Sequence, residues 1–216
     1  METQEEIKNL KEIVKIKVLN LYAGIGGNRK LWDDKKIEVT AIEIGPQIAK
    51  IYQDFFPNDK VIVTDAHQYL LEHYKEFDFI WSSPPCPSHS DWKRVWVDAG
   101  KQVPVYPEMD LYQEIIFLQN FFEGKWVVEN VISYYEPLIE PQKVGNHYFW
   151  ANFLIPGIKM SKRGAREDRH YLAKRKGFDL PEDANDKRQL LRNCVEPELS
   201  CHIFNMAFKE KQEVLF

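Results

Sequence analysis

Short apolar runs rich in β-branched residues alternate with longer amphipathic stretches between residues 15 and 131. This pattern is typical of a parallel β-sheet whose connecting helices pack on its two faces. Five runs predict strands, at residues 16–22, 39–43, 61–65, 77–83 and 126–131. Three stretches between them predict helices, at residues 47–55, 67–74 and 107–122. We therefore expect an α/β chain with a Rossmann-like, mostly parallel sheet and helices on both faces.

The pattern changes after residue 131, where prolines and tyrosines interrupt it. Further elements are predicted there: a strand at 147–155 that is half of a hairpin, a polar loop at 181–187 and a closing helix at 194–209. No internal repeat or low-complexity tract divides the chain. We expect one domain over residues 1–216, with a small basic insertion at 156–192.

Composition excludes several classes of protein. With 44% hydrophobic and 29% charged residues, the chain is not a disordered one. No apolar run approaches the ~20 residues that span a bilayer, and the first ten residues are acidic and polar, unlike a signal peptide. Three cysteines, Cys86, Cys194 and Cys201, form no Cys-x-x-Cys pair. We expect a cytoplasmic protein with reduced thiols and no metal.

Charge is unevenly distributed along the chain. The formal net charge of -4 argues against a protein that coats nucleic acid, yet residues 159–176 hold eight Lys or Arg against two acids. From this segment we expect nucleic-acid contacts by Lys162, Arg163, Arg166 and Arg169. The alternative is a solvated helical face, in which Glu167 and Asp168 pair with neighbouring arginines.

The first predicted strand leads directly into a glycine-rich turn and then a predicted helix. Ala23-Gly24-Ile25-Gly26-Gly27 lets the backbone turn tightly and approach a ligand at the helix N-terminus. Arg29 stands where a dinucleotide-binding motif needs glycine, which argues against a nicotinamide or flavin cofactor. Glu43 and Asp65 end the next two strands, where they are placed for ribose hydroxyls and an adenine amino group. Singly, these residues could form only a turn and two helix caps; together they favour an adenosine-containing cofactor without a pyrophosphate.

The fourth predicted strand leads into a lone cysteine braced by prolines, Pro84-Pro85-Cys86-Pro87. Such rigidity suits a positioned nucleophile, and the alternative, a small buried hydrophobe, fits poorly with the polar residues that follow. The fifth strand ends with Glu129 among apolar residues, where a carboxylate is costly unless it is paired or used. Both side chains are expected at one edge of the sheet, because parallel strands end together.

These residues resemble the motifs of the DNA cytosine-5 methyltransferases. The resemblance joins six segments: residues 22–27, Glu43, Asp65, Pro85-Cys86, Glu129-Asn130-Val131 and Asn193-Cys194-Val195-Glu196-Pro197. It implies a Rossmann-like methyltransferase fold, S-adenosyl-L-methionine as cofactor and DNA as substrate. It also implies that the last motif leads into a helix packed beside the glycine turn.

The resemblance implies roles for named residues. Cys86 adds to C6 of cytosine, Glu129 stabilises the ring as the thiolate adds, and Asn130 positions the loop that carries Pro85. The cofactor is held by Tyr22, Ala23, Gly24, Ile25, Gly26, Gly27, Glu43, Ile44, Asp65, Ala66, Asn193 and Val195. Nucleic acid is also contacted by Ser88, Ser90, Lys93 and Arg94, unless these merely solvate the loop. The target base must be flipped or already unpaired.

The chain departs from the family pattern at four places. Tyr22 replaces the usual Phe, Pro87 replaces Gln, and the segment between the last strand and the last motif is too short for a large recognition domain. The expected Gln-x-Arg-x-Arg motif is missing near residues 145–150; His147, Arg163 or Arg166 are candidates to replace its arginine, and the alternative for His147 is a strand residue satisfied by a carbonyl. These features leave three functions open: a compact DNA methyltransferase of a phage, mobile element or restriction-modification system, an RNA methyltransferase, or a catalytically impaired cofactor-binding subunit.

Overall fold

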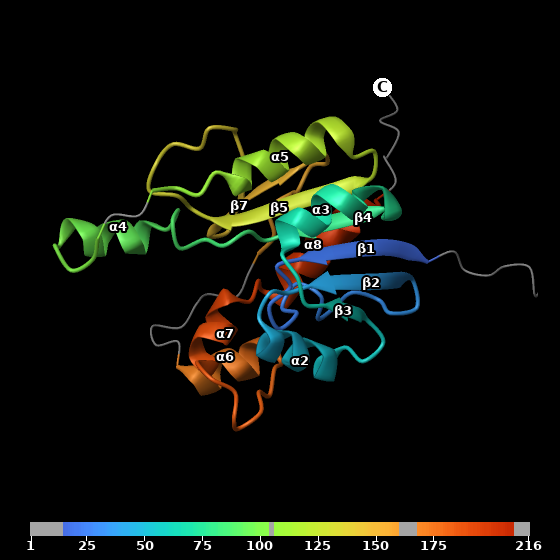
Figure 1. Cartoon of the computed structure of the whole chain (residues 1–216), viewed down its shortest axis with the longest axis horizontal. Coiled ribbons are helices and arrows are strands. Elements are labelled where there is room, and N and C mark those ends of the chain that lie inside the picture. Colours follow the sequence, from blue (N-terminus) through green and yellow to red (C-terminus); the bar gives the residue numbers. More distant parts are fainter. Residues whose placement is uncertain (1–14, 104–105, 160–167, 210–216) are drawn as a thin grey trace, which may run out of the picture.

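A seven-stranded sheet forms the centre of the molecule in the computed structural model, which describes residues 15–103, 106–159 and 168–209 (Figure 1). The strands are β1 (Ile16–Leu21), β2 (Ile37–Ile42), β3 (Lys60–Ile62), β4 (Phe79–Ser82), β5 (Lys125–Val131), β6 (Gln142–Val144) and β7 (His147–Ala151). Their order is β3-β2-β1-β4-β5-β7-β6. The first five are parallel, and β6 and β7 form an antiparallel hairpin on the β5 edge. The predicted α/β, Rossmann-like fold with a mostly parallel sheet is confirmed.

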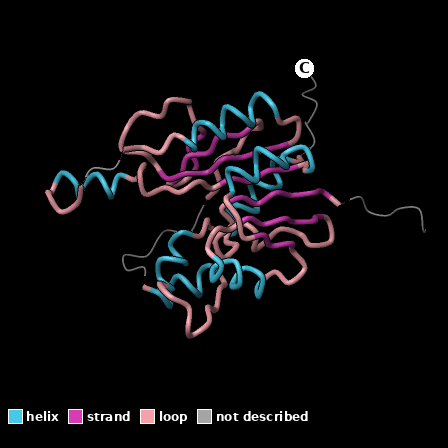
Figure 2. Tube along the Cα trace, in the orientation of Figure 1, coloured by secondary structure: helices cyan, strands magenta, loops and turns pink. Residues whose placement is uncertain are grey.

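Helices follow the strands and cover both faces of the sheet (Figure 2). They are α2 (Pro46–Phe55), α3 (Ala66–His73), the short 3-10 turn η1 (Tyr74–Glu76), α4 (Asp91–Asp98), α5 (Asp110–Phe121), α6 (Arg169–Lys176), α7 (Lys187–Asn193) and α8 (Pro197–Ala207). The predicted helices near α2, α3, α5 and α8 are confirmed with small shifts at their ends. α4 and α7 lie where no helix was predicted, and α6 lies within residues 159–176, for which a helical face was the alternative considered.

Two apolar layers enclose the sheet. On one face, Leu70 of α3 and Ile115 of α5 pack against Leu19, Ile80 and neighbouring strand residues. On the other face, α8 packs its Leu199, Ile203 and Phe204 against the side chains that alternate with these. This alternation follows from the two-residue period of a strand, which explains why the strands are apolar throughout their length.

A third apolar cluster joins the C-terminal helices to the glycine turn. Leu172 of α6 and Leu191 of α7 pack with Ile25 and with Tyr52 of α2. Residues 168–193 therefore share a hydrophobic core with the first half of the sheet.

The helix expected directly after the glycine turn is absent, and this prediction was wrong. Residues 24–36 instead form successive turns. Arg29 is 3% exposed, and its guanidinium donates two hydrogen bonds to Asp59, 2.8 and 3.0 Å long. This buried ion pair links the segment to the loop between α2 and β3, so the segment is held in place without forming a helix.

The position of α4 and the lengths of the helices complete the description of the fold. α4 projects away from the sheet on the side where the parallel strands end (Figure 1). No helix in the described ranges is long and apolar enough to cross a membrane.

Candidate active site

The residues singled out by the sequence lie at the carboxyl ends of the parallel strands. Tyr22 and Glu43 follow β1 and β2 directly, and Asp65 lies three residues beyond β3. The Cys86 loop follows β4, and Glu129 lies near the end of β5. The reversal of strand order between β1 and β4 creates the crevice in which such sheets bind ligands. The structure therefore brings the glycine turn and the cysteine loop to one edge.

The glycines of the turn have different roles. Gly24 has a φ of +55°, and a Cβ there would point into open space. A Cβ on Gly27 would lie 2.6 Å from the Cβ of Cys194, in the last of the recognised motifs. The turn thus leaves an open approach at Gly24 and is closely packed at Gly27.

Glu43 joins the glycine turn to the start of α2. Its side chain is 8% exposed and accepts hydrogen bonds from the backbone N–H groups of Gly24, at 3.0 Å, and Gly45, at 2.8 Å. Asp65 caps α3 by accepting from the N–H of Gln68 at 2.8 Å. Asp65 therefore has the capping role considered from the sequence, whereas Glu43 does not cap α2 and instead binds the N–H of its N-cap residue, Gly45. A carboxylate has about four acceptor positions, so each residue retains the capacity to bind a ligand.

The last recognised motif packs against the glycine turn, as expected. Val195 is buried, and its carbonyl oxygen lies 2.9 Å from where a Cβ on Gly27 would be. The Ser200 hydroxyl of α8 donates to the carbonyl of Asn28 at 2.5 Å. Asn193 ends α7, where its side chain accepts from Gln189. The helix that follows the motif thus lies beside the turn.

Asn130 holds the loop that carries Pro85. Its side-chain amide donates to the carbonyl of Pro84 at 3.1 Å. Beyond Cys86 the loop turns back, because the Cys86 carbonyl accepts from the N–H groups of His89 and Ser90, at 3.0 and 3.2 Å. The thiol is therefore presented from a loop fixed at both ends.

The carboxylate of Glu129 affects the charge state of the Cys86 thiol. Burial raises the pKa of the Cys86 thiol, and the carboxylate of Glu129 raises it further. Glu129 is 8% exposed. A carboxylate favours the neutral form of a neighbouring thiol, because two negative charges repel each other. In the free protein Cys86 is accordingly held as a thiol near neutral pH.

His147 stands beside the same carboxylate. It begins β7 and pairs in register with Val131 of β5. Its Nε2 lies 3.7 Å from Oε1 of Glu129, and both side chains are largely buried. Of the three residues considered as substitutes for the missing arginine, His147 is thus at the expected edge. Arg163 and Arg166 lie outside the described residues.

The predicted nucleic-acid contacts near the cysteine have mixed surroundings. Ser88 is buried, and its hydroxyl accepts from the N–H of Glu108, so it faces the protein and not the solvent. Ser90 precedes α4, and Lys93 lies within that helix. Arg94 is exposed and pairs with Asp98 of the same helix. The projecting helix α4, which we call the α4 arm, therefore offers a charged surface, but Ser88 does not contribute to it.

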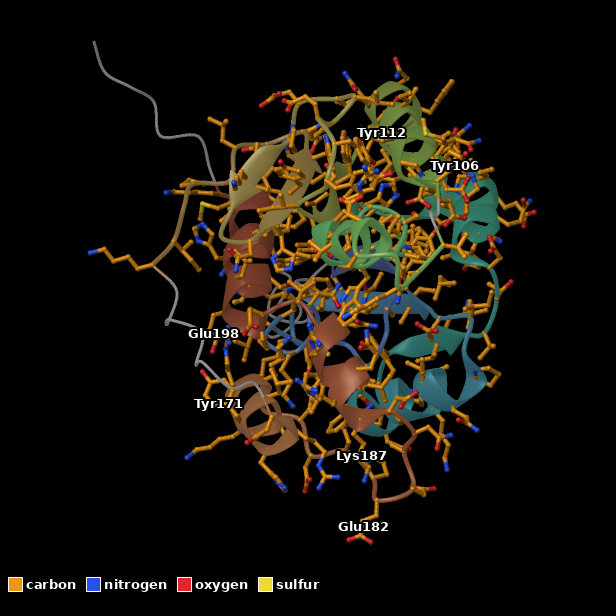
Figure 3. The ribbon with its side chains drawn as sticks, turned by 90° about the vertical axis from the view of Figure 1, so that its left-hand side faces the viewer. Tyr106, Tyr112, Tyr171, Glu182, Lys187 and Glu198 are labelled. Carbon is orange, nitrogen blue, oxygen red and sulfur yellow. The ribbon has the colours of Figure 1, made fainter. Side chains whose placement is uncertain are left out.

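The basic segment, residues 159–176, includes cations that are paired within the protein and are not available to a ligand. Lys162, Arg163 and Arg166 lie outside the described residues, whereas Arg169 begins α6 and is exposed. Arg175 pairs with Glu196 at 2.9 Å, and the buried Lys176 pairs with it at 3.5 Å. Figure 3 views the strand-end side of the molecule, with Tyr171 of α6 below and Tyr106 above. Two of the eight cations therefore stabilise the fold.

Sequence reasoning missed two supports of the site. His89 is 1% exposed, and its Nδ1 lies 2.5 Å from the hydroxyl oxygen of Tyr135. Burial lowers the pKa of His89, so this contact joins a neutral ring to the segment after β5. Glu114 of α5 is fully buried among apolar neighbours. The sequence feature that could have revealed Glu114 is an acid on the apolar face of a predicted helix, beside Leu111, Ile115 and Leu118.

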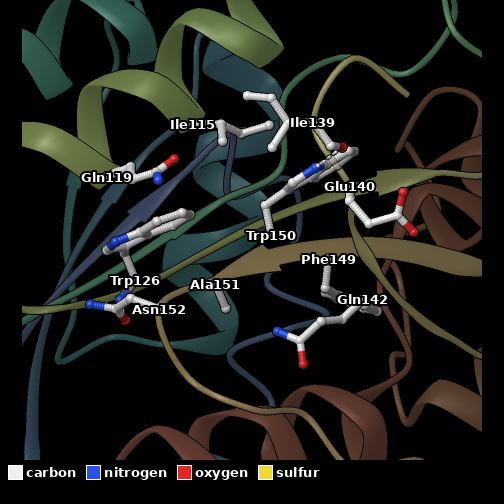
Figure 4. A pocket seen from close by; sticks show the side chains of 10 residues that line it. All are labelled: Ile115, Gln119, Trp126, Ile139, Glu140, Gln142, Phe149, Trp150, Ala151 and Asn152. Atoms are coloured by element: carbon white, nitrogen blue, oxygen red, sulfur yellow. Dashed lines mark hydrogen bonds between the residues drawn. The ribbon is translucent and has the colours of Figure 1, made fainter. Parts of the chain in front are cut away.

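A separate pocket lies away from the strand-end edge. It has a volume of about 320 Å³ and lies between α5, β5 and β7, with Trp126 and Trp150 among its lining residues (Figure 4). Trp126 is near the start of β5, at the opposite end of that strand from Glu129. The pocket is therefore distinct from the candidate active site.

Solved structures are similar to this chain, and the first named here shares its fold. The Entamoeba histolytica methyltransferase EhMeth is 10% identical, with a TM-score of 0.52, and the match covers 91% of this chain and 99% of that one. A SAM-dependent methyltransferase from Agrobacterium tumefaciens is 17% identical, with a TM-score of 0.40, and the match covers 59% of this chain and 42% of that one. No curated protein matched the chain.

The family model for C-5 cytosine-specific DNA methylases matches residues 16–131. This range is more than half of the chain and runs from β1 to the end of β5, so it includes the glycine turn, the cysteine loop and Glu129. The chain belongs to the C-5 cytosine-specific DNA methylase family, and it is a methyltransferase whose cofactor is S-adenosyl-L-methionine.

Proposed function

We propose that the protein methylates C5 of cytosine in DNA, with Cys86 as the covalent nucleophile and Glu129 as its partner on the ring. The observation that supports this most strongly is the proximity of the two side chains. Cys86 comes from the loop after β4 and Glu129 from β5; these strands are paired neighbours with Ser82 opposite Val128, and Asn130, next to Glu129, binds the carbonyl of Pro84. A single flipped base could contact both.

The residues at the strand ends fit the cofactor. Gly24 leaves open space on the turn, Glu43 is a buried acceptor beside it, and Ile44 is 67% exposed next to Glu43. An apolar side chain so exposed suits the face of an adenine ring, and the acidic residues suit the hydroxyl and amino groups of adenosine. When bound, the cofactor supplies an electrophilic methyl group on a sulfonium. Asp65, Ala66, Asn193 and Val195 complete the proposed set of contacts.

Cysteine addition is the step that this chain must perform. The thiol of Cys86 gives its proton to solvent, the sulfur forms a bond to C6, and the electron pair of the C5–C6 double bond moves into the ring, which makes C5 nucleophilic. Glu129 lies where it stabilises the ring nitrogen and exocyclic amine as this charge develops. After C5 has accepted the methyl group, the C5 proton passes to solvent, its electron pair re-forms the C5–C6 double bond, and the C6–S bond breaks to release the Cys86 thiolate.

His147 is proposed to take the place of the missing arginine. Its Nε2 is 3.7 Å from Glu129, so it is positioned near any base held by that carboxylate. An imidazole N–H can donate to a carbonyl oxygen, which is the function that the arginine has in the resembling family. The α4 arm and the segment at 156–192 are proposed to contact the nucleic-acid backbone.

A methylation assay tests this proposal. The protein is incubated with methyl-labelled S-adenosyl-L-methionine and matched duplex DNA, single-stranded DNA or RNA, and the modified base is mapped. We expect 5-methylcytosine in DNA and none with Cys86→Ser. Methylation of RNA alone would replace the proposed substrate, and no methylation of any nucleic acid would favour a cofactor-binding subunit.

A further inference from the structure

A fully buried carboxylate on α5 connects the two halves of the candidate active site. Glu114 has 0% exposure and accepts three hydrogen bonds. The Tyr22 hydroxyl donates to Oε1 at 2.6 Å, the Ser82 hydroxyl donates to Oε2 at 2.5 Å, and His67 Nδ1 lies 3.2 Å from Oε1. None of these contacts belongs to the Cys86 and Glu129 pair.

The three partners come from three strand ends. Tyr22 begins the glycine turn after β1, His67 lies in the first turn of α3 beyond Asp65, and Ser82 ends β4 four residues before Cys86. Burying a carboxylate is costly unless donors satisfy it. The three hydrogen bonds offset the cost of burying the Glu114 carboxylate. They also fix the positions of the three strand ends relative to one another.

Tyr22 is the most constrained of the partners. Its φ is +55°, a left-handed conformation that residues other than glycine adopt rarely and at an energetic cost. Burial and Glu114 raise the pKa of Tyr22, so the hydroxyl remains protonated and donates. The hydrogen bond thus holds a strained residue at the start of the turn whose Gly24 faces open space.

We propose that Glu114 is a positioning residue, which sets the glycine turn for the cofactor through Tyr22 and sets the Cys86 loop through Ser82. The proposal rests on the cofactor of the family and on the proposed role of Cys86. It assigns separate effects to the two arms of the network. Loss of the Tyr22 arm weakens cofactor binding, loss of the Ser82 arm frees the cysteine loop, and loss of the Glu114 charge does both.

Two measurements on the full chain test this assignment. The affinity for S-adenosylhomocysteine is measured by calorimetry, and the alkylation rate of Cys86 by peptide mass spectrometry. We expect Tyr22→Phe to bind about tenfold more weakly, since a hydrogen bond to a charged group is lost, with the alkylation rate unchanged. We expect Ser82→Ala to be alkylated faster and to bind within about twofold of wild type. Glu114→Gln should show both changes.

Matched controls separate positioning from general loss of structure. Ser83→Ala removes the next hydroxyl, which accepts from Trp81 and not from the network. Tyr74→Phe removes a hydroxyl from another partly buried tyrosine, whose ring packs edge-on against Phe117 of α5. Both should leave both measurements at wild-type values. Thermal melting of every variant is recorded, because a merely structural role would change affinity and alkylation in proportion to stability.

The double variant Tyr22→Phe with Glu114→Gln completes the test. If the two residues act through one hydrogen bond, the double variant binds no more weakly than the weaker single variant. Additive losses, or wild-type affinity in Tyr22→Phe, would overturn the proposal. Failure of the wild-type protein to bind S-adenosylhomocysteine would instead contradict the cofactor assignment, so the two failures are distinguishable.

Discussion

At the scale of single residues, the proposed chemistry depends on how the protein controls the charge of Cys86. Burial and Glu129 both raise the pKa of this thiol. A raised thiol pKa means that the reactive thiolate is scarce below that pKa and increases as the pH rises through it. Glu129→Gln removes one of the two causes. We therefore expect Glu129→Gln to increase the alkylation rate of Cys86 near pH 8 on the order of several-fold, measured by peptide mass spectrometry.

Cys194 provides an internal control for that prediction. Burial raises the pKa of Cys194 to about 12, and the thiol lies against Gly27 and away from Glu129. Its alkylation should stay slow in both proteins. An unchanged Cys86 rate in Glu129→Gln would mean that the two side chains do not interact in solution.

His147 makes a second prediction at this scale. His147→Ala should lower the methylation rate by at least about tenfold, because it removes the proposed donor to the base, with S-adenosylhomocysteine affinity unchanged. His202 of α8 is a suitable control, since its Nε2 lies 2.8 Å from the carbonyl oxygen of Pro156 and the residue is not assigned to the site. A His147→Ala enzyme with the rate of His202→Ala would exclude the assigned role.

At the scale of elements, one carboxylate fixes α6 to the segment before α8. Glu196 is 4% exposed and pairs with Arg175 and the buried Lys176. Removing one partner of a buried ion pair leaves an unpaired charge and costs about 3–5 kcal/mol. We expect Glu196→Gln to lower the free energy of unfolding by about 3 kcal/mol, measured by urea denaturation.

The exposed pair on α4 is the comparison for that variant. Arg94 and Asp98 are four residues apart, and both side chains are more than half exposed. Such pairs contribute about 0.3–0.5 kcal/mol, so Asp98→Asn should change stability little. Equal losses in the two variants would show that the Glu196 pairs contribute no more than surface contacts.

The elements also show what the sequence could and could not predict. The parallel strands, the hairpin and the placement of Cys86 and Glu129 at one edge follow from apolar runs and from the rule that parallel strands end together. The helix after Gly27 was predicted wrongly, because a buried Arg29 to Asp59 pair holds that segment and local pattern cannot reveal a partner 30 residues away. Glu114 was missed for the same reason, since its partner Tyr22 lies 92 residues from it.

At the scale of the whole molecule, the proposed binding of DNA by a protein of net negative charge requires a local basic surface. Lys162, Arg163 and Arg166 lie in the basic segment, outside the described residues. If each contacts one phosphate, neutralising all three should flatten the dependence of log affinity on log salt by up to ~3 units. DNA binding by fluorescence anisotropy over a salt series measures this slope.

The opposite edge of the sheet supplies the control. Lys17, Lys35 and Lys36 are exposed near the amino ends of β1 and β2, away from the strand ends that carry the site. Neutralising these three makes the same change in net charge and should leave the slope nearly unaltered. Equal slopes in the two triple variants would place the binding surface elsewhere.

The most direct test of the covalent mechanism uses DNA with 5-fluorocytosine at the target. Fluorine leaves no C5 proton to remove, so the Cys86 bond to C6 cannot be released. We predict a complex of protein and DNA that survives denaturation when S-adenosyl-L-methionine is present, is absent in Cys86→Ser and forms slowly in Glu129→Gln. A trapped complex in Cys86→Ser, or methylation at the wild-type rate by that variant, would contradict the assignment of Cys86 as the nucleophile.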